Sequence, residues 1–373
     1  MLSQLSVPAA LAAFLVPLAL AGAASADPAS DCRDVGRLSD QQRLAHCTAA
    51  LEVARDDRER AGLHIWRGVA HRTLGDRDAA LADFAEAEWL VPFWAGPMIE
   101  RAYLLSYEGE DAAAAEEALR GLAAEPESVD AIQSAMDLLA GAGRTEECLD
   151  LVPDAMRLAP EHPHTFASRG RCLHEGGRAV AAIADYRRAL ELGLDEAFLH
   201  SNLSRLLLDI GATAEGLSEA RRALELDPGL GLALRNLAVG MVESGEPEAA
   251  IAAWREGAPR LENDRDVGAN DLAWTLYAVG RHAEGLAVLE EALAAGVSLD
   301  RVDAVDTHAH LLAANGRPEE AVEAFLRAAE LGGEERRAIF EASLSALGFA
   351  PGKDLAARLR ACAATGAACR LNG

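Results

Sequence analysis

Apolar residues recur along most of the chain at the three- and four-residue spacing of an amphipathic helix. The periodic stretches are about twelve to fourteen residues long, and a glycine such as Gly75 or Gly177 separates the two stretches of each pair. Glycine at that place favours the left-handed turn that ends a helix. No run rich in Val, Ile and Thr alternates as a half-buried strand does. The pattern therefore predicts an all-α chain built of helical hairpins.

The turn glycines are 34 residues apart over six consecutive hairpins, and the series continues after insertions of one and two residues: Gly75, Gly109, Gly143, Gly177, Gly211, Gly245, Gly280 and Gly316. Two further columns, which begin at Ala80 and Ala87, hold Ala, Gly or Cys in the same register. Small residues let packed helices approach closely, and large rings fill the wider gaps. We therefore expect the columns to be contact points between stacked helices, with the gaps filled by Phe84, Tyr186, Trp254 and Phe325.

These columns resemble the pattern of tetratricopeptide repeats. Eight units begin near residues 61, 95, 129, 163, 197, 231, 266 and 302, although Ala118 and Val152 replace the aromatic residue in two of them. The resemblance implies a right-handed solenoid of stacked helical hairpins with helical caps. The predicted division is a signal peptide at 1–26, a capping half-repeat at 27–60, the eight repeats at 61–335 and a C-terminal helical cap at 336–373.

The first 26 residues form an uncharged apolar run that ends in Ala24-Ser25-Ala26, the small-x-small pattern that signal peptidases accept. We interpret this run as a cleaved export signal, and the alternative is a retained anchor, because the segment before the apolar run has no Lys or Arg. We therefore predict an exported, periplasmic protein with no membrane span once the signal is removed.

Six cysteines fall into three pairs of sequence neighbours, as expected in an oxidising compartment. The terminal pairs, Cys32 with Cys47 and Cys362 with Cys369, are predicted disulfides that hold the two ends of the chain. Cys148 and Cys172 fit either a third disulfide or two buried thiols.

The charge and the missing motifs limit the function. The formal net charge of −25 disfavours nucleic acid and anionic lipid as partners. No nucleophile elbow, phosphate-binding loop or zinc-protease motif occurs, so we expect no enzyme and no cofactor. Asp303, Asp306 and His310 share one helical face, but three such residues on one exposed helix are more typical of a solvated face than of a metal site.

The resemblance implies binding along a concave surface formed by the first helix of each unit. Transferred to this sequence, the candidate groove residues are Tyr103, Tyr107, Arg171, Asn202, Arg205, Arg235, Asn236, Asn270, Trp274, Tyr277 and His310. The arginines suit acidic groups of an extended peptide, and the aromatic zone around Trp274, with Asp271 and Asp306, suits an apolar or basic segment.

An alternative is that the arginines only pair within their own helices, Arg171 with Glu175 and Arg205 with Asp209. Arg235 has Val239 four residues on and so has no such partner in its helix. The sequence predicts a scaffold that binds a protein or peptide in the bacterial cell envelope. The alternative function is contact with peptidoglycan through the C-terminal segment, with the repeats as an assembly surface.

Overall fold

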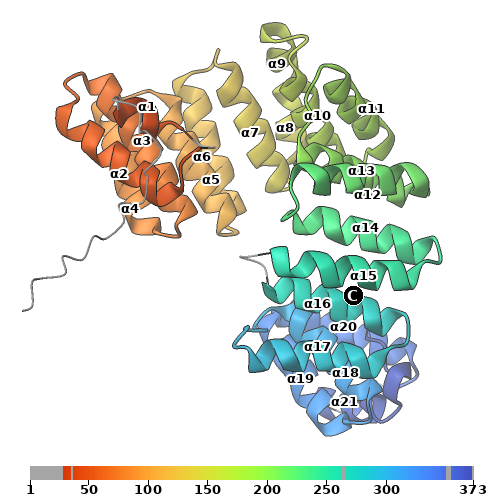
Figure 1. Ribbon diagram of the computed structural model, residues 1–373. Coiled ribbons are helices and arrows are strands. Elements are labelled where there is room, and N and C mark those ends of the chain that lie inside the picture. The colour runs from red at the N-terminus through yellow and green to blue at the C-terminus, as the bar shows by residue number, and fades with distance from the viewer. Residues whose placement is uncertain (1–27, 35–36, 262–264, 350–353, 372–373) are drawn as a thin grey trace, which may run out of the picture. The chain divides into compact units, whose positions relative to one another are not determined.

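The computed structural model describes residues 28–34, 37–261, 265–349 and 354–371 (Figure 1). Within these ranges the regular structure is helical and contains no strand, which confirms the predicted all-α repeat fold. The chain divides into two compact units, one ending at Leu158 and one beginning at Ala159. The predicted signal peptide lies outside the described residues.

The first unit consists of a short helix, a longer helix and a series of hairpins. Its helices are α1 (Pro28–Cys32), α2 (Asp40–Val53), α3 (Asp57–Thr73), α4 (Arg77–Leu90), α5 (Ala95–Tyr107), α6 (Asp111–Ala124), α7 (Val129–Gly141), α8 (Thr145–Asp150) and α9 (Val152–Leu158).

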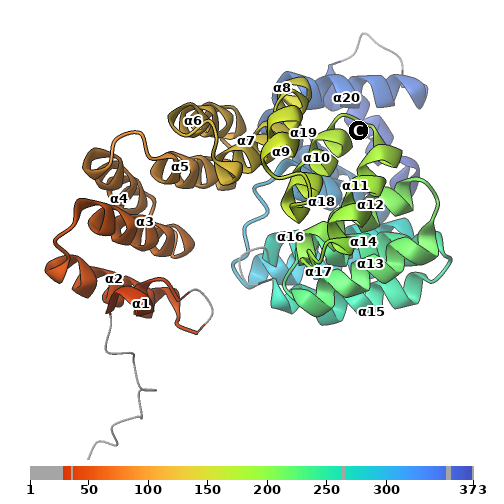
Figure 2. The ribbon, with the colours of Figure 1, turned by 90° about the horizontal axis from the view of Figure 1, so that it is seen from above.

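The second unit continues the series of hairpins and ends in two helices of a different register. Its helices are α10 (Pro163–Glu175), α11 (Ala179–Glu191), α12 (Ala197–Asp209), α13 (Thr213–Leu226), α14 (Gly231–Glu243), α15 (Pro247–Gly257), η1 (Ala258–Arg260), α16 (Arg265–Ala278), α17 (His282–Ala294), α18 (Val302–Ala314), α19 (Pro318–Leu331), α20 (Gly333–Ala346), α21 (Leu355–Ala363) and η2 (Gly366–Ala368). The two helices of a hairpin, such as α12 and α13, lie side by side in both views (Figures 1 and 2).

Glycine ends the first helix of each hairpin, as predicted. All eight turn glycines have φ between 68° and 81°, a region that residues with a Cβ rarely occupy. At Gly177 the next residue, Arg178, donates its amide to the carbonyl of Leu173 at 2.8 Å. This bond satisfies a carbonyl that the end of the helix would otherwise leave without a partner.

The small-residue columns are contact points between helices. The rings of Phe84 and Tyr186 are almost completely buried. A Cβ added to Gly68 would lie 2.5 Å from the Phe84 ring, and one added to Gly170 would lie 2.7 Å from the Tyr186 ring. A methyl group does not fit at either distance, so glycine at these positions allows the second helix of the hairpin to approach the first.

Disulfides lie near both ends of the described chain. Cys32 and Cys47 join α1 to α2 with an S–S distance of 2.05 Å, and Cys362 is joined to Cys369 with an S–S distance of 2.00 Å. In the C-terminal part, the buried guanidinium of Arg358 donates to the carbonyl oxygens of Phe349 and Glu341, so α21 is held against the end of α20.

Candidate functional site

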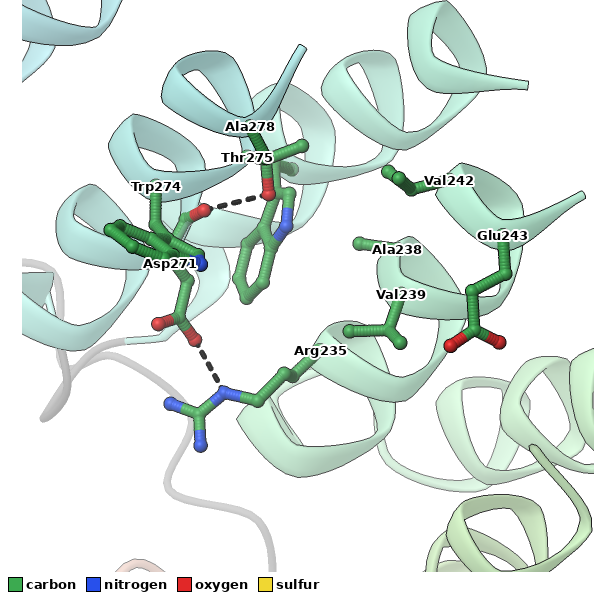
Figure 3. Close-up of a pocket in the computed structure, with 10 residues that line it drawn as sticks. Arg235, Ala238, Val239, Val242, Glu243, Asp271, Trp274, Thr275 and Ala278 are labelled. Carbon is green, nitrogen blue, oxygen red and sulfur yellow. Dashed lines mark hydrogen bonds and ion pairs between the residues drawn. The ribbon is translucent and has the colours of Figure 1, made fainter. Parts of the chain in front are cut away.

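The candidate site is a groove in the second unit, on the first helices of three consecutive hairpins, α14, α16 and α18. Between α14 and α16 the groove holds a cavity of about 390 Å³ (Figure 3). The buried ring of Trp254, from α15, lines this cavity, and the ring of Trp274 at its side is 41% exposed. We call this space the apolar pocket, and it is lined by Arg235, Ala238, Val239, Val242, Glu243, Trp254, Asp271, Trp274, Thr275 and Ala278.

The helical period explains why these residues face the same space. The lining residues of α14 that begin at Arg235 are spaced i, i+3, i+4, i+7 and i+8, and those of α16 that begin at Asp271 are spaced i, i+3, i+4 and i+7. Residues at this spacing share one face of a helix. The apolar pocket is therefore formed by equivalent faces of two neighbouring repeats, as the labelled side chains show (Figure 3).

An ion pair closes one side of the apolar pocket. The Nε of Arg235 donates to Oδ2 of Asp271 at 2.7 Å, and the two residues belong to neighbouring first helices. Burial raises the pKa of the Asp271 carboxyl above its ordinary value, and Arg235 only partly opposes that effect. Arg235 has no acidic partner four residues on in its own helix, and Asp271 of the next repeat supplies one. The guanidinium is therefore not an uncompensated charge.

A second, more polar cavity of about 440 Å³ adjoins the first, and both are lined by Arg235, Asp271 and Trp274. We call it the acidic pocket, and its other lining residues are Asn270, Asp303, Asp306, Thr307, His310, Arg336 and Leu371. Arg336, which comes from α20, donates to Oδ2 of Asp306 at 3.0 Å. Burial raises the pKa of Asp306, although the guanidinium of Arg336 opposes the shift.

His310 lies at the base of the acidic pocket and is only 1% exposed. Its Nδ1 lies 2.8 Å from the carbonyl oxygen of Asp306, and its Nε2 accepts the amide of Leu371 at 3.0 Å. This arrangement fits a neutral ring that donates from Nδ1. Both ring nitrogens therefore form hydrogen bonds inside the protein. The prediction that His310 and Asp306 lie on a solvated face is wrong, because both residues are buried. In the described ranges no cluster of three His, Cys, Asp or Glu side chains is arranged to hold a metal ion.

Two other candidate groove residues are packing residues rather than exposed contacts. Asn236 is buried and donates its side-chain amide to the carbonyl oxygen of Ser201 at 2.9 Å, which links α14 to α12. Tyr277 is 3% exposed and stacks on Trp274 with 5.2 Å between the ring centroids. Neither side chain lines the apolar space between α14 and α16 or the polar cavity beside it, so these two assignments are corrected to packing between helices.

The remaining candidates are spread over both units. In the second unit, Asn270 lines the acidic pocket and Arg205 pairs with Asp209 at 3.1 Å, as the alternative interpretation expected. Arg171 and Asn202 are half-buried on α10 and α12. Tyr103 and Tyr107 lie on α5 in the first unit, and the hydroxyl of Tyr103 donates to Ser134 at 3.0 Å.

Several residues that line the two pockets are not predicted from the sequence. Ala238 and Val242 had a usable signal, because they occupy the helical face that begins at Arg235. Arg336 and Leu371 had none, because they come from the C-terminal segment, which does not follow the repeat period.

No family model matches the chain. Among curated proteins, a 108-residue stretch is 36% identical to the human protein O-mannosyl-transferase TMTC3, over 29% of this chain and 12% of that protein. A 186-residue stretch is 26% identical to the tetratricopeptide repeat and J domain-containing co-chaperone DNJ1 of Fusarium oxysporum, over 47% of this chain and 35% of that protein. The chain thus spans about an eighth and about a third of the lengths of these two relatives.

Among solved structures, a human IFIT1 dimer with PPP-AAAA matches with a TM-score of 0.53 and 15% identity, over 79% of this chain and 69% of that chain. A likeness at this level of identity concerns the fold. In the described part of the chain, none of the helices combines the length and the apolar character that are needed to cross a membrane.

Proposed function

Because the chain is a tetratricopeptide repeat protein, we propose that it is a non-enzymatic scaffold that binds another protein through an extended segment seated in the groove of α14, α16 and α18. We further propose that it acts in the bacterial cell envelope after export. The proposed division of the chain is the one expected from the sequence, with eight repeats at 61–335 between a capping half-repeat and a C-terminal cap.

One observation carries the binding proposal: the groove exposes an aromatic ring beside an unfilled apolar space. Trp274 is 41% exposed, and the apolar pocket beside it is lined by Ala238, Val239 and Val242. Large aromatic side chains in such positions contribute much of the binding energy in protein interfaces. The charged residue at the edge, Arg235, is already paired, so a partner gains more from the apolar surface than from that guanidinium.

The test is capture of a partner from an envelope extract by the mature protein and by two matched variants. Trp274→Ala removes the ring in the groove, and Trp89→Ala removes a ring that is 72% exposed in the first unit. We expect the Trp89→Ala variant to retain the partner and the Trp274→Ala variant to lose it, with bound proteins identified by mass. Retention of every captured protein by both variants would contradict the proposed groove.

The terminal disulfides support the proposed oxidising location. Cys32–Cys47 and Cys362–Cys369 have bonded geometry, and bonds of this kind persist outside the reducing cytosol. Cys148 and Cys172 are each buried in their own unit, and their pairing stays a prediction.

A structural cap is our preferred role for the C-terminal segment, and contact with peptidoglycan remains the alternative. The cap is supported by the arginines of α21: Arg358 is buried against the end of α20, and Arg360 pairs with Glu319 at 3.2 Å. We therefore expect the purified protein not to sediment with purified sacculi. Sedimentation that is lost when Arg360 is replaced by alanine would favour the alternative.

A further inference from the structure

We propose that the groove selects a segment in which an apolar residue is closely followed or preceded by a lysine or arginine, with the apolar side chain in the apolar pocket and the cation in the acidic pocket. This inference rests on the proposed function, because it names the chemistry of the segment that the groove would bind.

Unsatisfied acceptors in the acidic pocket are the first observation. Asn270 and Asp306 are at least nine-tenths buried, and both line this pocket. Asn270 Oδ1 and Asp306 Oδ1 are enclosed and accept no hydrogen bond within the described residues. A buried acceptor without a donor carries an uncompensated desolvation cost. Each nitrogen of a lysine or arginine side chain carries donors and no acceptor, which is the chemistry that these two oxygens lack.

The charges that line the acidic pocket also favour binding of a cation. Three carboxylates, from Asp271, Asp303 and Asp306, face two guanidinium groups, from Arg235 and Arg336. The two arginines are paired with Asp271 and Asp306. Within the described residues, the ion pair of Asp303 is with its sequence neighbour Arg301 at 2.9 Å, and both side chains are half-exposed. Exposed ion pairs are weak, so Asp303 is the carboxylate that an incoming cation can engage most easily.

One of the two guanidinium groups in the acidic pocket, that of Arg336, shows how a cation is held there. The guanidinium of Arg336 bonds to Asp306 and lies 5.4 Å from the centroid of the Phe340 ring. A cation bound near Asp303 would repeat this combination of carboxylate and aromatic ring, with the exposed ring of Trp274 as the aromatic partner.

The two pockets are close enough to bind two side chains of one short segment. Both are lined by Arg235, Asp271 and Trp274, so only this row of side chains separates them. In an extended peptide, alternate side chains lie on the same face about 7 Å apart. An apolar residue and a cation separated by one or two residues would therefore reach the two pockets together.

The experiment is selection of peptides from a phage-displayed library of random linear sequences on the full-length mature protein. We expect the selected peptides to share an apolar residue within two or three positions of a lysine or arginine. A selected peptide is then synthesised in two forms, one with its arginine and one with citrulline, which keeps the shape and removes the charge. Their affinities are measured by fluorescence anisotropy against the protein and two variants.

The variants form a matched pair. Asp303→Asn removes a half-exposed carboxylate that lines the acidic pocket, and Asp209→Asn removes a half-exposed carboxylate on α12 that pairs with Arg205 outside both pockets. We expect Asp303→Asn to lower the affinity for the arginine peptide roughly threefold to tenfold and to leave the affinity for the citrulline peptide unchanged. We expect Asp209→Asn to change either affinity by less than about twofold.

The possible outcomes separate this inference from the proposed function. The inference would be overturned if the selected peptides require Trp274 but are not enriched in basic residues. It would also be overturned if Asp303→Asn and Asp209→Asn change the peptide affinity equally. Either result would leave the binding groove in place. Selection of no peptide, or of peptides that bind the Trp274→Ala variant as well as the unchanged protein, would contradict the proposed function itself.

Discussion

Replacement of Arg235 by alanine tests whether this arginine is part of the groove's internal structure. The side chain of Asp271 is 13% exposed, and Arg235 supplies its 2.7 Å ion pair. A buried group that loses its partner costs about 1–3 kcal/mol. The Arg235 side chain is 38% exposed, so water reaches the carboxylate once the guanidinium is gone. We therefore expect Arg235→Ala to lower the free energy of unfolding by about 1 kcal/mol at neutral pH.

The effect should depend on pH in a defined direction. In the folded protein, burial already raises the pKa of Asp271 above its ordinary value, and loss of Arg235 raises it further. A raised carboxyl pKa destabilises the fold when the group is ionised, and the cost disappears as pH falls toward the pKa of the unfolded chain, about 4. The cost of Arg235→Ala should therefore be full at neutral pH, above the raised pKa, and shrink steadily as the solution is acidified.

The assay is urea-induced unfolding followed by far-ultraviolet circular dichroism at several pH values. Arg205→Ala is the control, because Arg205 pairs with Asp209, whose side chain is 47% exposed, and we expect it to cost less than about 0.5 kcal/mol. In the Asp271→Asn background, Arg235→Ala should also cost less than about 0.5 kcal/mol. Equal costs for the two arginine variants, or a cost for Arg235→Ala that does not change with pH, would refute the reasoning.

Three further predictions concern the repeats and export. Gly170→Ala should lower the free energy of unfolding by about 1–3 kcal/mol in the same urea assay, because its methyl group would lie 2.7 Å from the Tyr186 ring. Gly62→Ala is the control and should be neutral or stabilising, because the nearest atom to its methyl group would be 4.0 Å away. Gly177→Val should cost about 1–3 kcal/mol, because φ at this position is 68°, and a cost no larger than that of Gly62→Ala would contradict the turn geometry. The exported protein should begin at Asp27 by intact-mass measurement, and a mass that includes residues 1–26 would indicate a retained anchor.

The repeat architecture could be predicted from the sequence because its signals are local and recur. Glycine at Gly75 and Gly177 is required by positive φ at the end of a helix, and the same turn returns with each hairpin. The column that contains Ala182 marks close helix contacts, and Tyr186 fills the adjacent space. Each of these residues acts within a hairpin or between neighbouring hairpins, so spacing alone identifies it.

The tight fit of individual contacts could not be predicted in the same way. Gly121 belongs to the small-residue column that begins at Ala87, a column that also accepts alanine. A Cβ at Gly121 would nevertheless lie 3.0 Å from the Ile99 side chain, so Ile99 must shift to accept it. Column membership shows that a small residue is needed and does not show how small.

The groove was predictable only in part, because its chemistry depends on partners from other repeats and from the cap. Helical spacing does not reveal the acidic partner of Arg235, because Asp271 lies 36 residues away in the sequence. The sequence predicts an exposed His310, because nothing in its own helix indicates that the amide of Leu371 bonds to its ring. Trp274 is a candidate groove residue from the sequence, and it lines the apolar pocket together with Val239, which holds the equivalent position one repeat earlier.

The central claim is that a partner segment occupies the groove of α14 and α16, and site-specific photocrosslinking in cells tests it most directly. Benzoylphenylalanine would replace Val239, which is 37% exposed and lines the apolar pocket, or, as a control, Val180, which is 77% exposed on α11 and lines neither pocket. The account predicts that irradiation joins a distinct protein to the chain substituted at Val239 and none to the chain substituted at Val180. Absence of any adduct at Val239, or the same adducts from both positions, would contradict it.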